Sequence, residues 1–184
     1  MRIVCFGDSN TYGYNPRDAL GGRYDAKSRW VDLLAEKTGW QVRNRGQNGR
    51  AIPLRYEQVD RLLKANAPVD VFLVMLGTND LLQGIGIREV TARMEAFLTH
   101  VRPLCKQILL VAPPPMQYGQ WVTDAHLLET SAQLGESFRR LSEKLDIPFA
   151  DAGQWNVEIA FDGVHLTEEG NRAFSEGIKT RLML

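Results

Sequence analysis

Short runs of apolar residues recur along the chain and alternate with longer stretches of mixed polarity. Five of these runs are typical of β-strands: residues 2–7, 41–46, 70–77, 107–112 and 148–152. The third run contains an unbroken apolar stretch from Val71 to Leu76. Such a pattern indicates a strand that is buried on both faces, as in a parallel sheet.

The stretches between these strands carry apolar residues at the three- and four-residue spacing of a helix face. Ser28 can cap a first helix, which stops at Gly39, and Pro53 suits the first position of a second helix. Two further apolar stripes predict helices over residues 90–101 and 127–145. Helices therefore separate the predicted strands.

A final helix, which Thr167 can cap, completes a fivefold repetition of strand and helix along the chain. Strands that alternate with helices are joined by right-handed crossovers, which place helices on both faces of one sheet. No linker or internal repeat interrupts the pattern. We therefore predict that residues 1–184 form a single three-layer α/β domain.

The composition excludes several classes of protein. Lys plus Arg and Asp plus Glu both total 22, so the net charge is zero and nothing indicates a nucleic-acid partner. No apolar run approaches the roughly 20 residues of a membrane helix, and the first residues resemble a strand rather than a signal peptide. Cys5 and Cys105 are too isolated to predict a disulfide or a metal site. We expect a cytoplasmic protein without membrane or metal partners, and its exposed aromatic residues would permit a homo-oligomer.

Polar residues follow the predicted strands, and the carboxyl ends of parallel strands form the usual ligand-binding edge of an open α/β sheet. These segments carry a serine, a glycine-rich turn, an asparagine and an Asp/His pair: Ser9, Gly49, Asn79, Asp162 and His165. Each type alone is commonly a turn or capping residue. Their joint placement at one edge favours a single active site.

These residue types have complementary roles in acyl transfer. A serine hydroxyl becomes an effective nucleophile when a neighbouring imidazole accepts its proton, so we predict that Ser9 attacks and His165 acts as base. Asp162 can orient the imidazole. The backbone N–H groups of Ser9 and Gly49 and the side-chain amide of Asn79 are candidate donors to the oxyanion. Walker A and His-Glu-x-x-His zinc motifs are absent from the sequence.

Four short blocks resemble, in order and spacing, those of the SGNH (GDSL-type) hydrolase superfamily: Gly7-Asp8-Ser9, Gly49, Gly77-Thr78-Asn79-Asp80 and Asp162-x-x-His165. The resemblance implies a three-layer α/β/α sandwich with a five-stranded parallel sheet, similar to flavodoxin. It also implies that the matching Ser, Asp and His are catalytic and that no metal or organic cofactor takes part. The matching Ser, Gly and Asn would form the oxyanion hole.

Further stretches resemble the arylesterase/acyltransferase branch of that superfamily, whose members hydrolyse small acyl esters. Cys5-Phe6-Gly7-Asp8-Ser9 and Pro113-Pro114-Pro115 belong to this similarity. Asn10 departs from the pattern, because leucine is usual at this position. We expect its side chain to face away from the nucleophile and to affect substrate preference more than catalysis. The second block is ambiguous, because Gly46 lies close to Gly49.

The loops after the first and fourth strands are expected to form the pocket wall. Seven side chains are candidates: Tyr12, Tyr14, Tyr24, Arg50, Met116, Tyr118 and Trp121. The chain has few residues for a lid, so we expect a small, open pocket and short acyl groups. The predicted activity is a serine esterase for small carboxylic esters. The alternatives are a carbohydrate O-deacetylase, a thioesterase, or a non-catalytic module that binds a small ligand.

Overall fold

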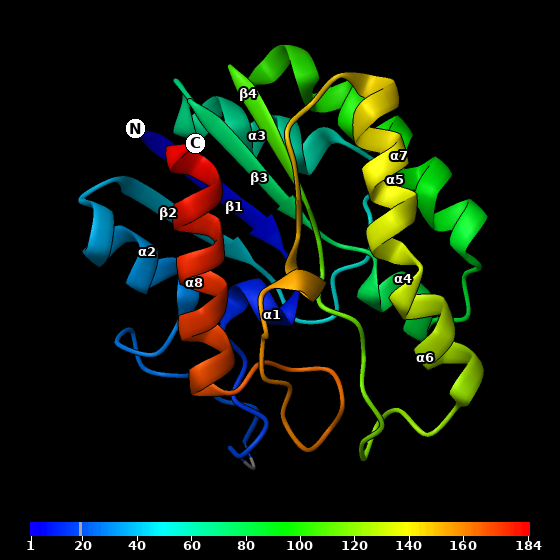
Figure 1. The fold of residues 1–184 in the computed structure, drawn as a ribbon. Coiled ribbons are helices and arrows are strands. Elements are labelled where there is room, and N and C mark those ends of the chain that lie inside the picture. The colour runs from blue at the N-terminus through cyan, green and yellow to red at the C-terminus, as the bar shows by residue number, and fades with distance from the viewer. Residues whose placement is uncertain (19) are drawn as a thin grey trace.

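The computed structural model describes residues 1–18 and 20–184, and its centre is a parallel β-sheet (Figure 1). The strands lie in the order β2-β1-β3-β4-β5. All neighbouring strands are parallel. Their bounds are β1 Arg2–Gly7, β2 Gln41–Gly46, β3 Val71–Met75, β4 Gln107–Ala112 and β5 Phe149–Asp151. The predicted five-stranded, flavodoxin-like sheet is thereby confirmed.

Helices cover both faces of the sheet, which gives the three layers expected from the sequence (Figure 1). One face packs against α2 (Trp30–Thr38) and α8 (Glu168–Met183). The other packs against α3 (Glu57–Asn66), α5 (Ile87–Val101) and α7 (Leu134–Leu145). The shorter helices are α1 Ser9–Tyr12, α4 Thr78–Leu82 and α6 Ala125–Ala132, with 3-10 turns η1 Arg102–Leu104 and η2 Ala152–Gln154.

The alternation of side chains along the strands builds a core on each face of the sheet. In β1, Ile3 and Cys5 face α2 and α8, whereas Val4 and Phe6 face the opposite helices. Burying one such large apolar side chain stabilises the fold by about 1.5–3 kcal/mol. The central strands are therefore held from both sides and form a rigid base for the loops at their carboxyl ends.

The strand predictions differ from the structure mainly at the ends and at the sheet edge. The strand predicted over residues 70–77 spans Val71–Met75, and the one predicted over 148–152 spans Phe149–Asp151. β2 has the predicted bounds, but its residues alternate between exposed and half-buried. β2 lies at an edge of the sheet, where one side of the strand has no neighbour.

Two predicted helix starts are wrong. α2 begins at Trp30 after Arg29, and the hydroxyl of Ser28 donates to Glu168 at 2.7 Å instead of capping the helix. α3 begins at Glu57 rather than at Pro53. The segment around Pro53 is a loop, in which the N–H of the preceding Ile52 donates to the buried carboxylate of Asp80 at 3.0 Å.

The remaining helix predictions agree with the structure except at one break. The stripe over residues 127–145 belongs to two helices, α6 and α7, which Gln133 separates. Thr167 is confirmed as the cap of α8, since its hydroxyl accepts the N–H of Gly170 at 3.0 Å. Among the residues that the structure describes, no helix has the length and apolar character required to cross a membrane.

Candidate active site

Ser9 lies directly beyond the carboxyl end of β1, at the start of the short helix α1. The Asp8 carboxylate accepts the N–H of Asn10 at 3.0 Å and caps this helix. The first N–H groups of a helix have no acceptor within the helix. Across residues 1–18 and 20–184, the Ser9 N–H has no hydrogen-bond acceptor. It is therefore available to a ligand beside the Ser9 hydroxyl.

A tight turn between β5 and α8 brings Asp162 and His165 together. One carboxylate oxygen of Asp162 accepts the backbone N–H groups of Val164 at 2.9 Å and His165 at 3.0 Å. The other oxygen lies 2.6 Å from Nδ1 of the His165 ring. Gly163 adopts φ +85°, a conformation that side-chain-bearing residues rarely adopt. The Asp-x-x-His spacing thus lets one carboxylate hold both the backbone and the ring.

The structure joins this turn to Ser9. His165 Nε2 lies 2.9 Å from Ser9 Oγ, although the two residues are 156 positions apart. Because Nδ1 faces a carboxylate, we assign its proton there, which leaves Nε2 free to accept the serine proton. Ser9, Asp162 and His165 are 7%, 0% and 3% exposed, so the chain of hydrogen bonds is shielded from water.

The charge on Asp162 is supported by its hydrogen bonds. Burial alone would raise the pKa of this carboxyl group. The bonds from the His165 ring and from the N–H groups of His165 and Val164 outweigh that effect and hold the pKa below its usual value. The carboxylate is therefore ionised at neutral pH and can accept the hydrogen bond from the imidazole.

Two candidate oxyanion donors lie just beyond the carboxyl ends of β2 and β3, the strands that flank β1. Asn79 is in the first turn of α4, after β3, and Gly49 is in the loop after β2. The Asn79 amide nitrogen donates to the Arg50 carbonyl at 3.2 Å, with the Asp8 carboxylate at 3.4 Å. In the part of the chain that the structure describes, the Gly49 N–H has no acceptor. Ser9, Gly49 and Asn79 line the same cavity.

Gly46, the alternative to Gly49 in the sequence, has a different structural role. It is the last residue of β2, and a Cβ added there would lie 2.1 Å from the backbone nitrogen of Tyr12 in α1. Gly49 has φ +71° and open space around the position of a Cβ. Gly46 therefore permits close packing of β2 against α1, whereas Gly49 faces the cavity.

The cavity above Ser9 has a volume of about 190 Å³. Its walls and floor are formed by Ser9, Tyr14, Asn48, Gly49, Asn79, Leu82, Trp121, Val164 and His165. Tyr14 and Trp121 pack against the imidazole, with ring centroids 4.4 Å and 5.1 Å from that of His165. Leu82 was not predicted from the sequence. Its position three residues after Asn79, on the same helix face, is the signal that could have indicated it.

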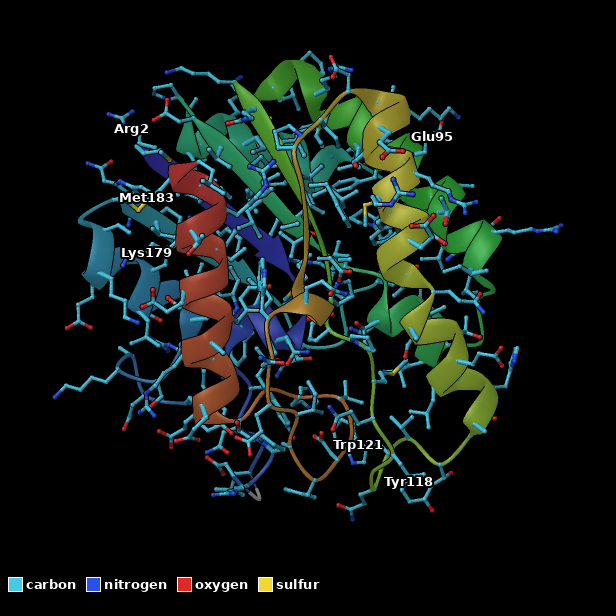
Figure 2. The ribbon with its side chains drawn as sticks, viewed as in Figure 1. Arg2, Glu95, Tyr118, Trp121, Lys179 and Met183 are labelled. Carbon is cyan, nitrogen blue, oxygen red and sulfur yellow. The ribbon has the colours of Figure 1, made fainter. Side chains whose placement is uncertain are left out.

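Five of the residues expected to line the pocket lie elsewhere. Tyr24 and Met116 are buried, and Met116 belongs to the hydrophobic core. The Tyr12 ring packs under the Arg23 guanidinium, 4.5 Å from the ring centroid. Tyr118 is 75% exposed on the loop after β4 (Figure 2) and is not among the residues that line the cavity.

Arg50 is the fifth of these residues, and it serves the loop rather than the cavity. Its guanidinium donates to the Gly7 carbonyl at 2.9 Å and to the Gln47 side chain at 2.9 Å. It also lies 4.1 Å above the Phe6 ring. Burial lowers the pKa of Arg50, and the nearby Asp8 carboxylate opposes that shift. Arg50 is not among the residues that line the cavity, and its contact with a substrate stays a prediction.

The loop that carries Trp121 is joined to the turn that carries Asp162. The Trp121 N–H donates to the Asp162 carbonyl at 3.0 Å, and the Gln117 N–H donates to the Gly163 carbonyl at 2.9 Å. Trp121 is 53% exposed and lines the cavity; Figure 2 shows it on the loop after β4, near Tyr118. Of the wall residues expected from the loop after β4, Trp121 lines the cavity.

Comparison with known proteins identifies the family. The sequence pattern of the GDSL-like lipase/acylhydrolase family matches residues 5–173, which is most of the chain. The chain belongs to this family. As the resemblance in the sequence implied, the GDSL-like protein is a carboxylic ester hydrolase of the SGNH type. No curated protein matches it significantly.

Several solved structures share the fold of this GDSL-like hydrolase. A carbohydrate acetylesterase family member from Sinorhizobium meliloti is 28% identical, with a TM-score of 0.85 and full coverage of both chains. An inhibitor-bound aryl esterase from M. smegmatis is 24% identical, with a TM-score of 0.88 over 100% of this chain and 99% of that one. A G-D-S-L family lipolytic protein from Veillonella parvula is 18% identical, with a TM-score of 0.77 over 98% and 97%.

No three His, Cys, Asp or Glu side chains lie close enough together to hold a metal ion within the described ranges. The groups that meet at the cavity of the GDSL-like hydrolase are a hydroxyl, an imidazole, a carboxylate and several N–H donors. This set has the chemistry required for transfer of an acyl group through serine.

Proposed function

We propose that the protein is a serine esterase that hydrolyses small carboxylic esters, with short acyl groups, through an acyl-enzyme intermediate. The observation that carries the proposal is the continuous chain of hydrogen bonds from Ser9 Oγ to His165 Nε2 and from His165 Nδ1 to Asp162. A serine that serves only as a cap or turn residue does not require a buried imidazole and a buried carboxylate in line with its hydroxyl.

In the proposed first step, Ser9 Oγ attacks the ester carbonyl carbon while His165 Nε2 takes the hydroxyl proton. Asp162 holds the ring in the required tautomer and stabilises the imidazolium that forms. The carbonyl oxygen becomes an oxyanion, which accepts hydrogen bonds from the N–H groups of Ser9 and Gly49 and from the Asn79 amide. To make this bond, the Asn79 amide gives up its hydrogen bond to the Arg50 carbonyl or its contact with the Asp8 carboxylate.

Collapse of the tetrahedral intermediate breaks the bond between the carbonyl carbon and the alkoxy oxygen. The imidazolium of His165 gives its proton to the departing alcohol, and an acyl group remains on Ser9. Water then attacks the acyl carbon while His165 accepts a proton, and a second collapse releases the carboxylic acid and restores Ser9. Each proton that leaves a nucleophile is thus returned to a leaving group.

The test is the Ser9→Ala variant with p-nitrophenyl acetate as substrate. We expect its kcat to fall by about 10³-fold or more, since loss of the nucleophile leaves only the remaining binding and electrostatic contributions. A fluorophosphonate probe should add one covalent group to the unmodified protein, as measured by intact mass, and none to Ser9→Ala.

Ser28→Ala is a matched control, because Ser28 is also 7% exposed but donates to Glu168, outside the cavity. This variant should retain the esterase activity and the labelling. Turnover by Ser9→Ala equal to that of the unmodified protein, or labelling of a different serine, would refute the proposal.

A second candidate substrate is an O-acetylated carbohydrate. The similarity to the carbohydrate acetylesterase family member from Sinorhizobium meliloti favours it, because that match covers both chains completely at 28% identity. The exposed ring of Trp121 at the cavity rim can stack on the apolar face of a sugar. The kcat/KM values for acetylated xylose, phenyl acetate and an acyl thioester should be compared. The highest value identifies whether the protein prefers acetylated sugars, aryl esters or thioesters.

A further inference from the structure

The side chain of Asn10 connects the segment that carries Ser9 to the segment that carries His165. Its Nδ2 donates to the carbonyl of Val164 at 3.0 Å. Its Oδ1 accepts the N–H of Leu166, also at 3.0 Å. The two partners are the residues on either side of His165. The side-chain amide of Asn10 thus donates one hydrogen bond to the backbone and accepts one from it, as a neighbouring peptide group in a β-sheet does.

Asn10 is itself held firmly in place. It is 5% exposed and follows Ser9 in α1. Its own N–H donates to the Asp8 carboxylate at 3.0 Å, and its carbonyl accepts the indole N–H of Trp30 at 3.0 Å. The side chain is therefore anchored to the same rigid segment as the nucleophile.

We infer that Asn10 is a positioning residue, which fixes the distance and direction between His165 and Ser9. The inference rests on the proposed function, in which His165 is the base. Asp162 bonds the imidazole ring and the backbone N–H groups of Val164 and His165. Asn10 bonds the backbone immediately before and after His165. The position of the imidazole ring is thus fixed both by Asp162 and by Asn10.

Leucine, which is usual at this position in the family pattern, has a similar size but cannot donate or accept a hydrogen bond. Asn10→Leu would leave the Val164 carbonyl and the Leu166 N–H without their partner in a buried setting, which favours movement of the turn. Displacement of a reacting group by about 1 Å can reduce a rate on the order of 10²-fold.

The sequence favoured an effect of Asn10 on substrate preference, whereas the hydrogen bonds of its side chain favour an effect on catalysis. As expected, the residue faces away from the reacting atoms, since its amide bonds the backbone of the His165 turn. It does not line the cavity above Ser9, however. Its replacement should therefore change kcat rather than the binding of different esters.

The first experiment measures kcat and KM of Asn10→Leu with p-nitrophenyl acetate. We expect kcat to fall about 10- to 100-fold while KM changes by less than about threefold, because the misplaced base acts on the chemical step. An unchanged kcat in the folded variant would overturn the inference, as would a loss confined to KM.

Asn171→Leu is the matched control. Asn171 is also buried, and its side chain likewise makes two bonds to the backbone: it accepts the Trp30 N–H at 3.1 Å and donates to the Thr167 carbonyl at 2.8 Å. Neither partner adjoins His165. This variant should lose thermal stability to a similar extent and retain a kcat close to that of the unmodified protein.

A double-mutant cycle tests whether Asn10 acts through His165. In the His165→Ala background no base remains to be positioned, so Asn10→Leu should cost less than about twofold further in kcat. A loss in that background equal to the loss in the unmodified protein would show a general structural role and overturn the inference. High activity of His165→Ala alone would instead overturn the proposed function.

Amide hydrogen exchange provides a measurement that does not depend on a folded variant. In the unmodified protein, the Leu166 N–H should exchange as slowly as the amides of the central strand β3, because it donates to Asn10 in a buried position. Exchange of the Leu166 N–H at the rate of exposed loop amides would overturn the inference.

Discussion

Asp8, the residue before the proposed nucleophile, is a buried carboxyl group with a strongly shifted titration. Burial raises its pKa from 3.8 to about 6, although the hydrogen bond from the Asn10 N–H and the nearby His165 and Arg50 charges act in the opposite direction. The carboxylate is needed as the cap of α1 but is poorly solvated. Local structure and electrostatics therefore conflict at this residue.

The conflict predicts a specific dependence of stability on pH. The folded-state pKa of Asp8 lies above its unfolded value, so the folded protein binds this proton more tightly. Protonated Asp8 therefore contributes to the free energy of unfolding. This contribution is complete below about pH 4 and is lost as the pH rises through about 6. Asp8→Asn removes the titration and retains an oxygen that can cap α1.

We expect the free energy of unfolding of Asp8→Asn, relative to the unmodified protein, to increase on the order of 2 kcal/mol between about pH 4.5 and about pH 7.5. Chemical denaturation of both proteins at several pH values measures this difference. A difference that stays constant, or that decreases as the pH rises, would contradict the raised pKa.

At the scale of elements, the approach of β2 to α1 positions the nucleophile. Gly46 ends β2 beside the backbone of Thr11 and Tyr12, and the Asn44 amide donates to the Thr11 carbonyl at 2.7 Å. α1 contains only four residues, too few to be stable alone. Its position, and hence that of Ser9, depends on contacts with neighbouring elements.

Gly46→Ala should therefore lower both stability and activity. The added methyl group would meet the α1 backbone and force the two elements apart, at a cost of about 1–3 kcal/mol. We expect kcat to fall on the order of 10-fold or more as Ser9 moves relative to His165. Thermal unfolding and esterase kinetics measure the two effects.

Gly39→Ala provides the control for a general loss of stability. Gly39 has φ +70° at the end of α2, with open space around a Cβ. Alanine there should cost about 1 kcal/mol through backbone strain and leave kcat unchanged. Equal effects of the two substitutions on kcat would argue against the role of the β2–α1 contact.

At the scale of the whole molecule, the order of the strands brings the residues of the candidate active site together. β1 lies between β2 and β3, so the loop with Gly49 and the helix α4 with Asn79 flank the segment that carries Ser9. The turn with His165 follows β5, which lies at the other edge of the sheet from β2, and His165 meets Ser9 and lines the same cavity. The order of the strands thus determines which segments meet at the cavity.

The cavity of about 190 Å³, walled by Tyr14, Leu82 and Trp121, predicts a preference for short acyl chains. In a series of p-nitrophenyl esters, kcat/KM should fall at least about tenfold between butyrate and octanoate. Trp121→Ala widens the rim and should reduce this preference. Equal kcat/KM values for acetate and octanoate would contradict a cavity that limits chain length.

The sequence predicted the layers of the fold and the convergence of Ser9, Asp162 and His165. Both predictions depend on periodicity and on the fact that parallel strands end at one edge of a sheet. The chemical roles of these residues remain predictions. The aromatic wall was predicted less well: Tyr14 and Trp121 line the cavity, whereas Tyr24 lies in the interior.

Helix starts were also harder to predict than the helices themselves. Ser28 has the chemistry of a helix cap, but its hydroxyl bonds to Glu168, which lies 140 residues away in the sequence. Thr167 was predicted correctly, because its partner is three residues away. Local hydrogen bonds follow from local sequence, whereas a distant partner that competes for the same hydroxyl does not.

The sequence by itself determined which segments are strands, which face of each helix is apolar, and which chemical groups stand at the strand ends. These properties depend on residues near one another along the chain. Only the tertiary structure decided that Arg50 supports a loop, that Gly46 packs against α1 and that Asn10 holds the His165 turn. Such roles depend on the direction of a side chain and on partners as far as 156 residues away, which packing of the whole chain sets.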